Sequence, residues 1–201
     1  MRVRDGFHRL YLFRAMRQSI RTTGKGTAMG DSFRGANFVG KNLSVFLKDY
    51  SLIGADFTGA HCKLATFDGL NLNDAIFYGA DLSSAKFRGI TATSATFYGA
   101  NCSVADFSAA ILNGASFYGA NCSHAIFNLS HMAAATCYGA DFSYAKLVEA
   151  TFNQSNLTGA DFTHTDCTDA HFDGADVQGT DFGAAVLNGT TFVGATGKRF
   201  R

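Results

Sequence analysis

The sequence predicts an all-β solenoid, a chain wound into stacked coils instead of a layered domain. Three observations predict this class. Segments built around Tyr-Gly-Ala return every 20 residues, small residues return every five, and the chain of 201 residues contains no proline. A fixed period is the signature of repeat architectures. Proline is excluded from such folds because it removes a donor from the hydrogen-bonded ladder of a central strand.

Two of every five positions are small or apolar along most of the chain. Alanine dominates at the multiples of five from Ala55 to Ala195. Phe or Leu dominates two residues later, from Phe57 to Phe192, and all five cysteines occupy this second class. Neither class carries a charge at any position, so we expect both to point into the core.

This unit resembles the repeat of the pentapeptide-repeat family, A(D/N)LXX, with Leu or Phe at its centre. The centres run from Leu47 to Phe192, about 30 repeats, and continue in another frame at Phe33, Phe38 and Leu43. The resemblance implies a right-handed quadrilateral β-helix in which four repeats form one coil. The 20-residue period supports four sides, because residues 20 apart then lie above one another. Coils about 4.8 Å apart would make a rod roughly 36 Å long.

The period divides the chain into four parts. The centres shift by four residues instead of five between Leu43 and Leu47, where we expect a corner or bulge. We predict a basic amphipathic arm or capping helix at 1–30, an irregular first coil with this register break at 31–46, the β-helix at 47–195 and a basic tail at 196–201.

The N-terminal segment 1–30 carries seven basic side chains and one acidic one. Asp5 can cap a short N-terminal helix, on which Arg14, Arg17 and Arg21 share one side and apolar residues another. Three roles fit this segment: a lid over the first coil, an organelle targeting segment, or an arm that contacts an acidic protein surface, a nucleic acid or an anionic membrane. The three arginines are the candidate contacts in the last case.

Outward-facing residues carry the other candidate sites. One set is expected to stack as an aromatic ladder, which either stabilises the sheet or docks a protein partner. Its members are Tyr78, Tyr98, Tyr118 and Tyr138. Asp or Asn at the position before the centre, as at Asp81 and Asn101, is expected to hydrogen-bond turn amides.

Charge is distributed unevenly, although the net charge of the chain is only +1. Between Leu147 and Ala195 there are seven acidic residues and no basic one. Such a surface attracts cationic partners. The candidate contacts in this acidic half are Asp161, Asp173 and Asp181.

No catalytic residue, metal site, cofactor or small-molecule substrate is predicted. His131 and His171 share a face, as do His124 and His164, but the members of each pair are two coils and therefore about 9.6 Å apart, too far to share one metal ion. No apolar run reaches the roughly 18 residues of a membrane helix. The cysteines are expected to be free thiols in a reducing intracellular compartment, or in a mitochondrion or plastid if the arm is a targeting segment.

The sequence therefore predicts a non-enzymatic scaffold that binds one or more proteins within a larger assembly. An alternative follows from the resemblance, because some pentapeptide-repeat proteins imitate DNA, bind DNA gyrase or another topoisomerase and protect it from quinolones. The acidic half fits this alternative. The unbroken repeat up to Phe192, without the C-terminal dimerising module of those proteins, does not.

Overall fold

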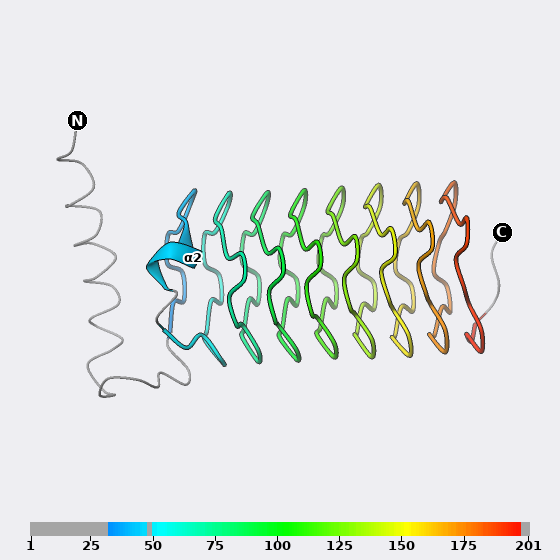
Figure 1. The fold of residues 1–201 in the computed structure, drawn as a ribbon, viewed down its shortest axis with the longest axis horizontal. Coiled ribbons are helices and arrows are strands. Elements are labelled where there is room, and N and C mark those ends of the chain that lie inside the picture. The colour runs from blue at the N-terminus through cyan, green and yellow to red at the C-terminus, as the bar shows by residue number, and fades with distance from the viewer. Residues whose placement is uncertain (1–31, 48–49, 198–201) are drawn as a thin grey trace.

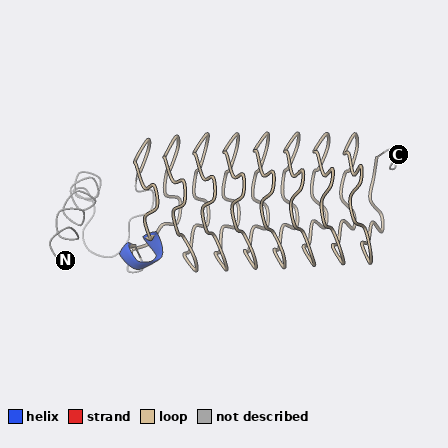
Figure 2. Ribbon diagram, turned by 90° about the horizontal axis from the view of Figure 1, so that it is seen from above, coloured by secondary structure: helices blue, strands red, loops and turns tan. Residues whose placement is uncertain are grey.

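The structure, a computed structural model, describes residues 32–47 and 50–197, which wind into a regular stack of coils. Figure 1 shows the coils side by side along the long axis, from the first (blue) to the last (red). Figure 2 shows the same stack from above, with α2 as the helix at one end. The predicted β-solenoid is confirmed. The predicted arm, with Arg14, Arg17 and Arg21, lies outside the described residues, as does most of the tail.

Parallel bridges between residues 20 apart set the register of the coils. Ile76 pairs with Thr96, Thr96 with Ser116, and Ser116 with Thr136. Each bridge is a single residue long. The described part of the chain contains no β-strand of more than one residue. The chain turns after every bridge, which gives each coil four corners.

The backbone hydrogen bonds of one repeat follow a fixed scheme. The amide of Phe97 donates to Ser116 in the next coil (2.6 Å), that of Gly99 donates to Tyr118 (2.9 Å), and that of Asn101 donates to Ala80 in the previous coil (2.9 Å). The fourth amide of each repeat donates to a carbonyl of the same repeat and closes the turn. The fifth amide belongs to the first turn residue and has no backbone partner in the described repeats. In many repeats an Asp or Asn side chain accepts it, which pairs a backbone donor that the ladder leaves unused.

The second turn residue has a positive φ at every regular corner. This conformation strains residues other than glycine, yet 15 non-glycine residues adopt it, among them Ala109, Ala134 and Tyr144. The repeated hydrogen bonds and the buried core on either side hold these residues in place. Backbone geometry therefore does not by itself require glycine at a corner.

Phenylalanine columns fill the centre of the rod. Phe97, Phe107 and Phe117 are fully buried. Rings one coil apart stack, as for Phe97 and Phe117 (4.6 Å between centroids, 8° between planes), whereas rings on neighbouring sides meet edge to face, as for Phe107 and Phe117 (5.9 Å, 84°). Both arrangements are favourable for aromatic pairs, and the inward-facing class predicted from the sequence is confirmed.

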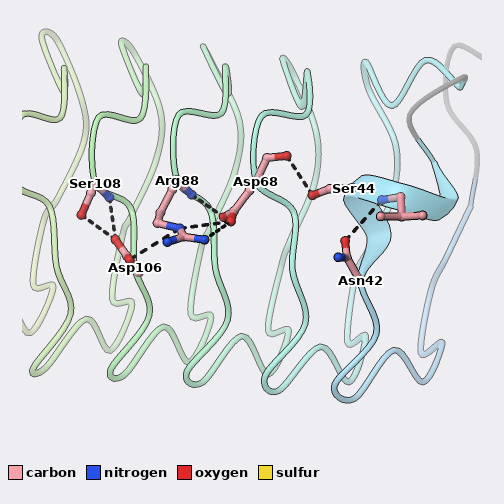
Figure 3. Close-up of polar contacts among 7 residues, drawn as sticks. Asn42, Ser44, Asp68, Arg88, Asp106 and Ser108 are labelled. Atoms are coloured by element: carbon pink, nitrogen blue, oxygen red, sulfur yellow. Dashed lines mark hydrogen bonds and ion pairs between the residues drawn. The ribbon is translucent and has the colours of Figure 1, made fainter.

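The first coil is four residues longer than the others, because Ser32 pairs with Asp56 and Asn37 with His61, whereas Asp56 pairs with Ile76. The extra residues form α2, Leu43–Phe46, a single helical turn in place of the expected corner or bulge. Figure 3 shows how it is held: Asn42 Oδ1 accepts from the amide of Val45 (3.2 Å), and Ser44 Oγ donates to the carbonyl of Asp68 (2.8 Å). No helix in the described ranges has the length and hydrophobicity needed to cross a bilayer.

Candidate functional site

The four predicted ladder tyrosines stack on one corner of the rod. Centroid distances between successive rings are 5.0, 4.8 and 5.1 Å, and the planes differ by 6°, 4° and 13°. The residues remain between 39% and 52% exposed. The rings face one another along the rod, so the ring edges and hydroxyl groups face outward. The ladder members are Tyr78, Tyr98, Tyr118 and Tyr138.

The backbone amides of these tyrosines differ from those at neighbouring levels of the same corner. Above and below the ladder, Thr58 and Thr158 donate to Asp56 Oδ1 and Asn156 Oδ1. At the tyrosine levels Ile, Thr or Ser replaces that Asp or Asn. Within residues 32–47 and 50–197 the four tyrosine amides have no hydrogen-bond partner. The tyrosine corner thus presents a row of backbone donors that the protein itself does not use.

A column of glycines lies next to the ladder. Every second turn residue at this corner is glycine, namely Gly59, Gly79, Gly99, Gly119, Gly139, Gly159 and Gly179. From Leu64 to Ala184 the next corner along the coil contains none at the equivalent positions, which include Val104 and Tyr144. A Cβ at Gly99 or Gly119 would meet no atom within 4 Å. Neither packing within the rod nor φ explains the column. Sequence reasoning missed it, although the 20-residue period alone could have shown it.

Asp and Asn residues form the third column of this side. They accept from turn amides, as Asp141 does from Ser143 (2.8 Å) and Asn121 from Ser123 (3.0 Å), which confirms their predicted structural role. From Ile76 to Gly197 no lysine or arginine occupies the three columns. We call the tyrosine, glycine and Asp/Asn columns together the tyrosine edge.

The three acidic candidates do not form one cluster. Asp161 and Asp181 lie in the Asp/Asn column of the tyrosine edge and pair in one bridge. Each accepts from an amide two residues on, at 2.8 Å. Asp173 lies at another corner, where it accepts from the amide of Val193 in the next coil (2.8 Å).

Basic side chains of the rod are partly neutralised near its N-terminal end. The Arg88 guanidinium binds Asp68 (Nε to Oδ2, 3.0 Å) and lies 3.9 Å from Asp106 (Figure 3). Arg34 pairs with Asp56 at 3.0 Å. Burial acts to raise the pKa of Asp56, but hydrogen bonds from Thr58 and Arg34 outweigh it and hold that pKa below its ordinary value.

All five cysteines are free and buried. Burial raises the pKa of Cys62 and of Cys167 to about 12, and raises those of Cys122 and Cys137 as well. Thiols of this kind stay protonated at neutral pH and are poor nucleophiles. Among the residues that the structure describes, no three His, Cys, Asp or Glu side chains could hold a metal ion together.

The histidine pairs lie two coils apart, as predicted. The ring of Tyr144 lies between those of His124 and His164, with centroid distances of 5.0 and 4.7 Å. The spacing of the histidines in the sequence did not predict this aromatic stack. His131 and His171 line a shallow groove at the corner two turns away from the tyrosine edge. In a coil with four corners this is the opposite corner.

Comparison with known proteins agrees with the coil geometry. The profile of the family described as pentapeptide repeats matches in 8 copies, over residues 51–89, 75–114, 95–132, 135–166 and 165–196. No curated protein matches the sequence.

Solved structures of similar fold include QnrB1, described as a plasmid-mediated fluoroquinolone resistance protein. The full-length form is 16% identical with a TM-score of 0.52, covering 86% of this chain and 94% of that one. A trypsin-treated form is 21% identical with a TM-score of 0.50, covering 83% and 87%. At these identities the likeness shows the fold alone. The repeated match of the family profile, together with coils of four five-residue repeats, shows that the chain belongs to the pentapeptide-repeat family.

Proposed function

We propose that this protein is a non-enzymatic scaffold that binds a basic protein surface along the tyrosine edge. The observation that carries the proposal is the row of exposed, stacked tyrosine rings, beside backbone amides that have no partner among the described residues. A protein partner can supply the missing acceptors, and exposed tyrosines are well suited to interfaces. The glycine column supports close approach, since glycine lets another backbone come near.

Charge indicates which kind of partner fits. The tyrosine edge contains Asp81, Asp141, Asp161 and Asp181 without a lysine or arginine from Ile76 onward. Carboxylates of this kind steer cationic surfaces during association. Their Oδ1 atoms already accept from the turn amides, but a carboxylate has further acceptor sites for a partner.

Photo-crosslinking in the native source tests the proposal. A benzoylphenylalanine replaces either Tyr118 in the ladder or Tyr144 on the next corner, which is 52% exposed and serves as the matched control. We expect one basic protein to crosslink at position 118 and not at 144. Changing Asp141 and Asp161 to Asn should then slow its association, with a weaker dependence on salt. Equal crosslinking at both positions, or none at 118, would refute the proposed surface.

The alternative remains a DNA mimic that occupies a type II topoisomerase. QnrB1 shares the fold, and the acidic half fits, but Asp161 and Asp181 are separated from Asp173, so these three charges do not form one continuous stripe. A gyrase supercoiling assay distinguishes the two functions. Inhibition by low micromolar protein would replace the scaffold proposal with the mimic, whereas unchanged supercoiling supports the scaffold.

A further inference from the structure

A groove with a volume of about 720 Å³ runs along the corner opposite the tyrosine edge. One wall consists of second turn residues, with Leu129, Glu149 and Asp169 in successive coils. The other consists of bridge residues, with His131, Thr151 and His171 paired in the same order. The groove therefore follows the rod axis and presents a new pair of side chains at every coil.

The two ends of the groove differ in chemistry. Ile111 and Leu129 at the N-terminal end are 37% and 52% exposed. Glu149 and Asp169 provide two carboxylates in successive coils at the other end, and no lysine or arginine of residues 32–47 or 50–197 lines the groove. The carboxylate of Asp169 occupies the place that a Cβ of residue 189 would take, so glycine at this position makes room for it. The groove is thus apolar at one end and anionic at the other.

The histidine wall is held in a fixed orientation. His171 Nδ1 forms a hydrogen bond of 2.9 Å with Thr191 Oγ1, and His131 Nδ1 lies 3.5 Å from Thr151 Oγ1. The His171 imidazole is therefore positioned through Nδ1 by the threonine of the next coil, and the His131 imidazole only approaches its threonine. The Nε2 atoms remain available to hydrogen-bond a ligand.

We propose that this groove binds an extended basic segment of another protein. An apolar side chain of the segment lies over Ile111 and Leu129, and a Lys or Arg side chain reaches Glu149 and Asp169. The two contact points, Leu129 and Asp169, are two coils apart, about 9.6 Å. Same-face residues of an extended chain are about 7 Å apart, and a long basic side chain covers the difference. The site lies on a different edge from the proposed scaffold surface and does not depend on it.

The probe is a synthetic peptide, acetyl-Ser-Leu-Thr-Lys-Thr-Lys-Gly-amide carrying a fluorophore, titrated against the full chain by fluorescence anisotropy. We expect saturable binding that weakens about tenfold in the double variant Glu149→Gln plus Asp169→Asn, since each lost charged contact weakens binding by roughly threefold. The fold tolerates these changes, because Gln154 already adopts the same positive φ and Asn accepts it readily. Replacing the peptide's Leu with Ser should weaken binding about fivefold.

The matched control removes two charges that lie outside both the groove and the tyrosine edge. Asp173→Asn plus Asp176→Asn changes the net charge by the same amount, keeps an Oδ1 acceptor for the amides of Val193 and Gln178, and should alter peptide affinity by less than about twofold. Equal weakening by both double variants would show non-specific attraction and overturn the proposal, as would the absence of saturation at about 1 mM peptide. Crosslinking of the partner at position 118 should persist when Glu149→Gln and Asp169→Asn are introduced. The peptide titration and the crosslinking experiment can therefore fail independently of each other.

Discussion

Replacing Phe117 with alanine tests the inward-facing frame on which both surfaces depend. The ring is fully buried and lies 4.6 Å from Phe97, 5.9 Å from Phe107 and 5.8 Å from Phe127, centroid to centroid. Deleting a buried phenylalanine costs about 3–5 kcal/mol of unfolding free energy, and each lost aromatic pair adds roughly 0.5–1.5 kcal/mol. We expect the upper part of that range, because coils fixed by hydrogen bonds cannot collapse into the cavity.

The adjacent residue provides the control. Tyr118 also loses two stacked neighbours when it is replaced with alanine, Tyr98 at 4.8 Å and Tyr138 at 5.1 Å, but its outward position leaves no cavity. Its substitution should cost no more than about 1 kcal/mol, typical of surface changes.

Guanidinium unfolding followed by far-UV circular dichroism and by tyrosine fluorescence measures both variants. The two probes must agree, because long repeat arrays can unfold without a single cooperative transition. The assignment of inward-facing and outward-facing positions would be wrong if Phe117→Ala lowered the unfolding free energy by less than about 1 kcal/mol. It would also be wrong if Tyr118→Ala cost more than Phe117→Ala.

Four further outcomes are expected. Ser130→Ala should stabilise the protein by about 1 kcal/mol, because its buried hydroxyl has no partner in the part of the chain that the structure describes, whereas Ser155→Ala should destabilise it, since that hydroxyl donates to a carbonyl at 2.6 Å; denaturant melts compare the two. The five cysteines should react with Ellman's reagent only after unfolding, and rapid reaction of the native protein would contradict their burial. The pKa of Asp56 is lowered in the folded protein, so its charge stabilises the fold at pH values above the unfolded pKa of about 3.9. This stabilisation should be lost as the pH falls through the folded pKa. The difference in unfolding free energy between the wild type and Asp56→Asn should therefore shrink between pH 6 and pH 2.5. Gly119→Ala should cost about 1–2 kcal/mol of stability, because a positive φ strains alanine even where its Cβ meets no atom, and should leave the protein folded, as Ala109 is at a similar φ, while reducing crosslinking of the partner at the tyrosine edge.

Much of the fold was predictable because one period governs both contacts and burial. The five-residue period identified Phe117 as buried, and the 20-residue period placed Tyr98 over Tyr118. The same period places Asp173 on a different corner from Asp161, because their positions do not differ by a whole number of coils. Treating the two residues as one acidic set because both are charged overlooked this difference. The unpaired tyrosine amides could not be predicted, because the hydrogen-bond scheme of the other repeats had to be known first.

The helical turn at the register break was also not predictable from the local sequence. Apart from the N-cap Asn42, the local sequence carries no strong helix signal, and only the pairing of Ser32 with Asp56 and of Asn37 with His61 shows where the chain rejoins the stack. Physically, a helical turn takes up about 3.6 residues with an advance of about 5.4 Å. It can therefore absorb the extra residues of the first coil with little displacement.

The role of segment 1–30 stays a prediction with three forms: lid, targeting segment or binding arm.

The four-cornered coil has a consequence for how such a protein can change during evolution. Duplicating or losing four consecutive repeats lengthens or shortens the rod by one coil and leaves every column in phase. Losing only one repeat keeps the buried pattern intact, but rotates everything downstream by a quarter turn, so that a column such as the tyrosines would be cut and continued on the neighbouring corner. Selection on the surfaces therefore requires insertions of whole coils, while selection on the core accepts insertions of any whole number of repeats.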